Sequence, residues 1–237
     1  MSTSCLDIVL NLVVLVSYLT EDAIRLRTHL FSQLYVAELR AEKNEEKMFL
    51  PTAHQPFVFQ SLRCCLRYHV LLQLLEGFFR KSKVSMIEIG VHTASTATFL
   101  LNRLSSLQWT GVDPYNGYGN VSGDQFYSDA MMKLKAFEGR ARLLRMPSSA
   151  AYETTGPFEG LDESSFDVLF VDGDHDYNAT LEDLRAWSRF VRPGGIVAGH
   201  DIFNPVNDAV TLAVEDFLKD KNQVVNFATD HTYWWMK

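Results

Sequence analysis

The chain has 237 residues, of which 47% are hydrophobic and 22% are charged, and its formal net charge is −7. A chain of this length and composition can build one large or two small domains around a sizeable core. Because phosphate binding needs clustered Lys and Arg, and the sequence has no basic block, nucleic acid is not expected as a main partner. The three cysteines, Cys5, Cys64 and Cys65, have neither disulfide-framework nor zinc-site spacing and favour a reducing compartment.

Residues 1–80 are expected to be helical and to form an N-terminal cap or dimerisation region. The apolar segment Leu6–Leu19 has 14 residues, whereas a membrane span needs about 20. No Lys or Arg precedes it, as a secretory signal peptide would require. We therefore expect a buried or dimer-forming helix in a cytoplasmic protein, with membrane association as the less favoured alternative. Further helices are expected over Thr20–Glu46 and Phe57–Phe79.

From Lys83 onward, short apolar runs alternate with helical stretches, and this pattern predicts an α/β protein with a parallel, doubly wound sheet. Helical stretches follow the first five of the seven expected strands. The last two strands are separated only by Ala228–His231, so they are expected to form an antiparallel hairpin. The seven expected strands are Ser85–Gly90, Gln108–Asp113, Ala141–Met146, Phe166–Asp172, Gly195–Asp201, Val224–Phe227 and Thr232–Met236.

The end of the first expected strand carries a candidate nucleoside site. Gly90 lets the backbone turn tightly beside a ligand, and a helix that begins near Ala94 or Ser95 would present free N–H groups. A dinucleotide fingerprint would have glycine where His92 and Ser95 stand, so a nicotinamide dehydrogenase is the weakest enzyme hypothesis. Asp113 follows Gly90 by 23 positions, at the end of the second strand, where a carboxylate can accept both hydroxyls of a ribose.

Two later strands end in groups that can bind a metal or move a proton. Asp172 and His175 follow the fourth strand, and His200-Asp201 ends the fifth. If these strands are neighbours, they lie about 4.8 Å apart and their polar ends converge in one crevice. Asp172, His200 and Asp201 would then be three potential ligands from two adjacent strand ends, which is typical of a metal site. The alternative for His200-Asp201 is a helix cap and a satisfied polar residue.

Four motifs in this order, EIGVHTAST, VDPY, FVDGDHDY and RPGGIVAGHD, resemble the class I S-adenosylmethionine-dependent methyltransferases. The pattern is most similar to that of the small O-methyltransferases, including the catechol, caffeoyl-CoA and natural-product sugar types. The resemblance covers about residues 55–237. It implies a Rossmann-like seven-stranded sheet with a reversed C-terminal hairpin, and an S-adenosylmethionine-binding domain over residues 81–237.

The resemblance implies a set of cofactor contacts along the strand ends. Glu88 and Gly90 would line the methionine part of S-adenosylmethionine, and Ser95 or Thr96 would lie near its carboxylate. Asp113 would accept the ribose. The adenine would meet Ser148 and Ser149, after the third strand.

The resemblance also implies a divalent metal site and a general base. Asp172, His200 and Asp201 match the metal ligands, and His175 matches the base. Catechol-type enzymes have a carboxylate where this chain has His200. Mg²⁺ prefers oxygen ligands, whereas imidazole suits Mn²⁺, Fe²⁺ or Zn²⁺, so the resemblance implies a divalent metal, Mg²⁺ or Mn²⁺, whose identity the sequence leaves open. The alternative is that His200 does not bind the metal and faces the substrate. Asp174 and Asp176 are expected to support the loop.

The implied activity is methyl transfer to a hydroxyl oxygen of a small molecule, with metal lowering the pKa of that hydroxyl and His175 taking its proton. Tyr115–Phe126 could act as a mobile lid, and the loop around His54 and Gln55 could approach from the other side. Two alternatives stay open. One is a non-heme iron oxygenase that uses His175, His200 and a carboxylate, and the other is a non-catalytic module with the same fold.

Overall fold

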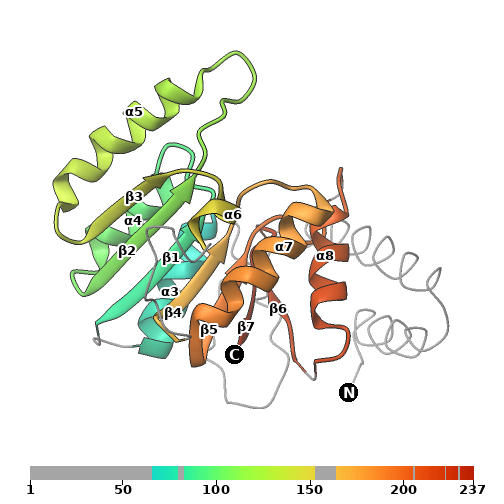
Figure 1. Ribbon diagram of the computed structural model, residues 1–237. Helices are drawn as coiled ribbons and strands as arrows, with labels where there is room; N and C mark the ends of the chain where they lie inside the picture. Colours follow the sequence, from blue (N-terminus) through green and yellow to red (C-terminus); the bar gives the residue numbers. More distant parts are fainter. Residues whose placement is uncertain (1–65, 80–82, 153–163, 205, 222, 229) are drawn as a thin grey trace, which may run out of the picture.

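The computed structural model describes residues 66–79, 83–152, 164–204, 206–221, 223–228 and 230–237 (Figure 1). The expected helices over residues 6–19 and 20–46, the start of the helix expected over 57–79, and the loop around His54 and Gln55 lie outside these residues. The boundary expected at residue 80 therefore stays a prediction. Among the described helices, none is long and apolar enough to cross a membrane.

Helices and strands alternate through most of the described chain. The strands are β1 (Val84–Ile89), β2 (Leu107–Asp113), β3 (Ala141–Arg145), β4 (Phe166–Val171), β5 (Val191–Gly199), β6 (Asn226–Phe227) and β7 (Tyr233–Met236). The helices are α3 (Arg67–Phe79), α4 (Ser95–Arg103), α5 (Gly123–Leu134), α6 (Ser148–Ala151), α7 (Tyr177–Trp187) and α8 (Ala209–Leu218), with 3₁₀ turns η1 (Lys135–Phe137) and η2 (Ser188–Phe190).

The strands form one seven-stranded sheet in the order β3-β2-β1-β4-β5-β7-β6. β1 to β5 run parallel, and β7 pairs antiparallel with both β5 and β6. The predicted doubly wound α/β fold with a reversed C-terminal hairpin is thereby confirmed. The chain direction across the sheet reverses between β1 and β4, which is where ligands bind in open sheets of this kind.

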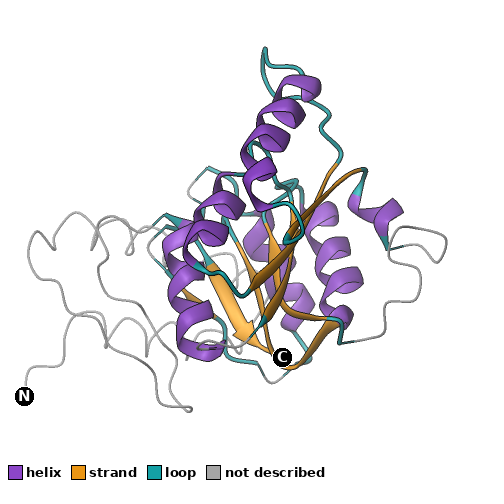
Figure 2. Cartoon of the chain, turned by 90° about the vertical axis from the view of Figure 1, so that its left-hand side faces the viewer, coloured by secondary structure: helices purple, strands orange, loops and turns teal. Residues whose placement is uncertain are grey.

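Helices cover both faces of the sheet (Figures 1 and 2). On one face, residues such as Leu71, Leu100 and Ala130 join α3, α4 and α5 to the sheet in one buried cluster. On the other face, residues such as Leu184 and Val214 join α7 and α8 in a second cluster. The central strands β1 and β4 are largely buried and mostly apolar on both sides, as buried parallel strands generally are.

The bounds of β5 and β6 differ from the sequence expectations. β5 begins at Val191 rather than Gly195, because Val191 pairs with Phe166 of β4 and the Gly194 N–H bonds the Lys237 carbonyl at 2.7 Å. α7, the helix before β5, ends at Trp187 and is followed by η2. β6 has two residues rather than four, and α6 is a single turn. These are the edge and the connections of the sheet, where pairing depends on distant partners.

Candidate functional site

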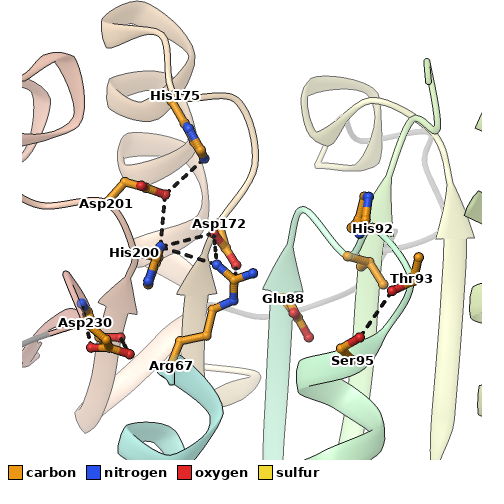
Figure 3. Close-up of polar contacts among 12 residues, drawn as sticks. Arg67, Glu88, His92, Thr93, Ser95, Asp172, His175, His200, Asp201 and Asp230 are labelled. Carbon is orange, nitrogen blue, oxygen red and sulfur yellow. Dashed lines mark hydrogen bonds and ion pairs between the residues drawn. The ribbon is translucent and has the colours of Figure 1, made fainter. Parts of the chain in front are cut away.

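The candidate site lies at the carboxyl ends of β1, β2, β4 and β5 (Figure 3). Here the loop after β1 meets the backbone that follows β4. Gly90 has a φ of +87°, and a Cβ at this position would stand 2.2 Å from the Asp172 carbonyl oxygen. The missing side chain at Gly90 therefore allows the two loops to touch, while the Asp172 N–H bonds the Ile89 carbonyl at 2.8 Å.

Asp172 is held by a guanidinium that the sequence did not point to. Arg67, the first residue of α3, places Nε 3.1 Å from Asp172 Oδ2 and Nη1 3.5 Å from Asp172 Oδ1. The same Nη1 lies 3.3 Å from Nδ1 of His200. Burial raises the pKa of the Asp172 carboxyl to about 6, although the charges of Arg67 and His200 oppose this shift. The Asp172 charge is therefore only partly compensated.

Asp201 connects the two histidines of the site. Its Oδ2 lies 3.1 Å from His175 Nε2 and 2.9 Å from His200 Nδ1. Burial alone would raise the pKa of Asp201, but the hydrogen bond and charge of His200 outweigh it and hold this pKa well below its usual value. The pair Asp201–His175 is a carboxylate that orients an imidazole, with the His175 side chain 49% exposed toward solvent.

The Nδ1 atom of His200 cannot satisfy both of its neighbours at once. It can donate a proton to Asp201 or accept one from Arg67, because one ring nitrogen has one of the two roles. Burial would lower the pKa of His200, yet its hydrogen bond to Asp201 and the charge of Asp172 give a net increase. The Asp201 interaction is the stronger of the two. His200 Nδ1 also lies 3.8 Å from Asp172 Oδ1.

One group of side chains in the described part of the chain can surround a metal ion. One ligand atom each from Asp172, His175 and Asp201 lies within 4.8 Å of the others. The imidazole of this set is that of His175, which the resemblance assigns to the general base. The resemblance instead gives His200 as the third metal ligand. The structure thus brings together all four expected residues of the metal and base sites; His175 completes the set, and His200, whose Nδ1 is bonded to Asp201, lies beside it.

The backbone around this group is strained. Asp201 and Phe203 have positive φ angles of 67° and 56°, which non-glycine residues adopt rarely. Asn204 holds the strained segment by donating from Nδ2 to Asp201 Oδ1 at 2.9 Å. Strain of this kind is retained where the surrounding structure fixes it, and it commonly marks functional sites.

The other two carboxylates of FVDGDHDY support the loop, as the sequence predicts. Asp176 caps α7 by accepting the N–H groups of Asn178 and Ala179 at 2.8 and 3.3 Å. Asp174 Oδ1 accepts the Asp176 N–H at 3.1 Å. These bonds fix the short connection between β4 and α7 that carries His175.

Glu88 lies within the sheet, next to the Asp172 strand. Its side chain is 1% exposed, and Oε2 accepts a hydrogen bond from Trp109 Nε1 at 2.7 Å. Burial raises the pKa of Glu88 to about 8, opposed by the Trp109 hydrogen bond and reinforced by the charge of Asp172. A buried carboxyl of this kind favours a positively charged ligand nearby.

Asp113 binds backbone N–H groups of two loops. Its Oδ2 accepts those of Val91 and His92 at 2.8 and 2.9 Å, and its Oδ1 accepts that of Tyr115 at 2.7 Å. Asp113 therefore fixes the turn after β1 against the turn after β2. A carboxylate has about four acceptor sites, so at least one remains for a ribose hydroxyl.

The helix start after β1 lies where the sequence predicts it. α4 begins at Ser95 after Ala94, which has a φ of 55°. Ser95 is exposed, while Thr96 is 4% exposed and faces the core. Lys133 of α5 donates to the Thr93 carbonyl at 2.8 Å and approaches Ser95 Oγ at 3.4 Å. Ser95 is thus the better placed of the two to reach a ligand.

Ser148 and Ser149 occupy different environments at the start of α6. Ser148 is half-buried and hydrogen-bonds Asp183 of α7, whereas Ser149 is exposed. Asp183 is 7% exposed, and burial raises its pKa to about 6 while the Ser148 bond opposes the shift. Ser148 therefore has a structural partner that the sequence did not point to.

The expected lid over Tyr115–Phe126 is part loop and part helix. Tyr118 is 82% exposed and pairs with Val121 through an isolated bridge, and Ser122 caps α5. The Phe126 ring packs at a tilt against the His92 ring, with centroids 4.2 Å apart, so α5 contacts the loop after β1. This contact places the segment beside the candidate cofactor site, which is the position that a lid would need.

Sequence reasoning missed Arg67, Trp109 and Asp183 as members of this site. Arg67 is 105 positions from Asp172, and no local pattern links them. Trp109 reads only as a core residue of its strand. Of the three, only Asp183 could have been found from the sequence. It is a carboxylate on the apolar face of a predicted helix, and a buried carboxylate must have a hydrogen-bond partner.

The part of the chain that forms the candidate site matches a known protein family. Residues 87–202 match the family model Methyltransf_24, described as a methyltransferase domain. This range spans β1 to the end of β5 and contains nearly all the side chains of the candidate site.

Individual relatives are distant. The chain is 23% identical over 166 residues to the uncharacterized protein R132 of Acanthamoeba polyphaga mimivirus, covering 70% of this chain and 67% of that protein. An O-methyltransferase from Bacillus cereus, solved in complex with SAH, has a similar fold, with a TM-score of 0.51, 13% identity and coverage of 87% and 90%. A TDP-rhamnose 3′-O-methyltransferase of calicheamicin biosynthesis gives a TM-score of 0.50, 13% identity and coverage of 71% and 79%.

Proposed function

The chain carries a methyltransferase domain of the class I fold over residues 87–202, and from this premise we propose that it transfers a methyl group from S-adenosylmethionine to a hydroxyl oxygen of a small molecule. The observation that carries the proposal is the convergence of Asp172, His175 and Asp201 at the end of β4 and β5, beside the loop that Gly90 closes. A proton acceptor and two carboxylates thus lie next to the expected cofactor position.

Support for S-adenosylmethionine comes from Glu88 and Asp113. The buried Glu88 carboxyl, with its raised pKa, would be stabilised as an anion by the ammonium of the methionine part. Asp113 keeps an acceptor site free for a ribose hydroxyl. Structures with the same fold include the Bacillus cereus enzyme in complex with SAH, the product of S-adenosylmethionine after transfer.

The donors of the site fit a divalent cation. Asp172 and Asp201 would hold it with an imidazole of His175 or His200, a mixed oxygen and nitrogen set that suits Mn²⁺ or Fe²⁺ better than Mg²⁺. The incompletely compensated charge of Asp172 favours such an ion. When bound, the metal would lower the pKa of the acceptor hydroxyl.

The protein's own residues would then position the acceptor and remove its proton. His175 Nε2 faces Asp201, which orients the ring and stabilises the imidazolium that forms when His175 takes the proton. The sulfonium of the cofactor already activates the methyl group, so the fold mainly supplies alignment of methyl and oxygen. With His200 as the metal's imidazole, His175 is left free for this role.

The test is a transfer assay with S-adenosylmethionine that carries a labelled methyl group, run against a panel of small hydroxylated acceptors. We expect label in an ether product, with SAH formed in equal amount. His175→Ala should lower turnover by about 10²–10⁴-fold, the usual size of a general-base contribution, and leave cofactor affinity nearly intact. Label on nitrogen or carbon, or none on any acceptor, contradicts O-methylation. A large loss of cofactor affinity in His175→Ala contradicts the base assignment.

A further inference from the structure

We infer that Arg67 is an internal competitor of the metal: its guanidinium occupies the cation position at Asp172, and a divalent ion binds only when Arg67 withdraws. The inference rests on the metal site of the proposed function and adds a residue from α3 that controls its affinity. Figure 3 shows the Arg67 side chain reaching from α3 to Asp172 and His200.

The contacts of Arg67 use the same atoms that a metal would need. Nε lies 3.1 Å from Asp172 Oδ2, and Nη1 lies 3.5 Å from Asp172 Oδ1, so both carboxylate oxygens face the guanidinium. Nη1 is also 3.3 Å from His200 Nδ1. A guanidinium has donors but no acceptor, so it cannot join a coordination shell. Its charge also repels a cation placed against Asp172.

The competition is reversible because Arg67 can leave the site without disturbing the core. It is the first residue of α3, and its side chain is 40% exposed. The helix is anchored by other residues, including the buried Val70, Leu71 and Leu74. By contrast, the Asp172 side chain is 10% exposed and is fixed at the end of β4. The arginine therefore moves, and the carboxylate keeps its place.

The chain supplies a matched control at the other end of the same strand. Arg192 Nε lies 2.6 Å from Asp167 Oδ1, near the start of β4, and its side chain is 39% exposed. Both pairs join a half-exposed arginine to a more buried aspartate of the β4 segment. Only the Arg67 pair lies beside His175 and Asp201, so only its removal should change metal binding.

The test measures Mn²⁺ binding by calorimetry and by the loss of the free-ion electron paramagnetic resonance signal, without cofactor or acceptor. Arg67→Gln should bind Mn²⁺ tighter than the wild type by on the order of tenfold or more, since a charge-assisted pair no longer has to be broken. Arg192→Gln should match the wild type. In Asp172→Asn the binding should be lost, which locates the ion.

Unchanged or weaker binding by Arg67→Gln overturns the inference while leaving the metal site in place. If neither Arg67→Gln nor the wild type binds Mn²⁺, the inference and the metal site fall together, and the labelled-methyl assay in chelator then decides methyl transfer separately. Arg67→Lys is the second variant in case Arg67→Gln does not fold. Its ammonium keeps the charge but cannot hold both Asp172 oxygens as a planar fork does, so its Mn²⁺ affinity should lie between those of the wild type and Arg67→Gln.

Discussion

The indole Nε1 of Trp109 donates a hydrogen bond of 2.7 Å to Oε2 of Glu88 inside the sheet. The two residues belong to neighbouring strands, β2 and β1, and both are 1% exposed. Gly111 makes room for the ring, since a Cβ there would stand 2.3 Å from the Trp109 ring. The tryptophan thus keeps a carboxyl buried next to the expected cofactor position.

Removing the Trp109 donor should destabilise the protein. In Trp109→Phe, Glu88 keeps its place without a partner, and an unsatisfied buried acceptor costs about 1–3 kcal/mol, in addition to the cavity left by the smaller ring. Urea denaturation gives the free energy of unfolding. In a Glu88→Leu background the same Trp109→Phe change should cost less, because the acceptor is gone. Equal costs in both backgrounds would mean that the hydrogen bond contributes nothing.

Stability should fall as pH rises toward 8 because of Glu88. Its pKa is about 8 in the folded protein against an ordinary value of 4.5, so between these values the folded state keeps a proton that the unfolded state loses. A group with a raised pKa stabilises at low pH, and this contribution is lost as pH approaches 8. Asp172 and Asp183 act in the same direction only up to about pH 6. Between pH 6 and 8, the urea midpoint of unfolding should therefore depend less on pH in Glu88→Gln than in the wild type. An unchanged slope in that variant would rule out Glu88 as the source.

Much of the fold could be predicted because parallel strands are continuous apolar runs. β4 begins at Phe166 as expected, and β1 to β3 match to within a residue at each end. The ends of β4 and β5 gave Asp172 and His200 as neighbours because adjacent parallel strands end together. The expected start of β5 and the expected length of β6 were wrong, because pairing with Phe166 and Lys237 decides the first and pairing at the sheet edge decides the second.

The site could be predicted only where its residues follow strand ends. Asp113 and His175 have this position, and their partners are backbone groups or a neighbouring strand end. Arg67 and Trp109 were missed for the opposite reason. Their partners, Asp172 and Glu88, are reached across the fold by long side chains, and nothing in the local sequence records such a contact.

The Asp113 carboxylate should be needed for stability as well as for cofactor binding. Asp113→Asn has one acceptor oxygen for three N–H groups, from Val91, His92 and Tyr115, and we expect a loss of about 1–3 kcal/mol. Thermal melting with and without S-adenosylmethionine measures both effects. The surface variant Asp124→Asn, which removes an 82% exposed carboxylate, should lie within about 0.5 kcal/mol of the wild type. If Asp113→Asn is as stable as the wild type, Asp113 has no role in stability and only the role in ribose binding remains.

The two serines after β3 should have different effects: Ser148 on stability and Ser149 on cofactor binding. Ser148→Ala removes the hydrogen bond to the buried Asp183 and should cost about 1 kcal/mol near pH 7. Ser149 is exposed, so Ser149→Ala should leave the melting temperature unchanged and, if this serine contacts adenine, weaken cofactor binding. Differential scanning fluorimetry and calorimetry measure the two quantities. A stability loss in Ser149→Ala, or none in Ser148→Ala, would contradict these assignments.

The most direct test of the methyltransferase account is calorimetric titration of S-adenosylmethionine into the wild type and Asp172→Asn, each with and without a chelator. The account predicts one cofactor bound per chain in all four titrations, because Glu88, Gly90 and Asp113 form the cofactor site and Asp172 belongs to the metal site. Methyl transfer should be lost in Asp172→Asn and in chelator. Absence of cofactor binding by the folded wild type would contradict the account.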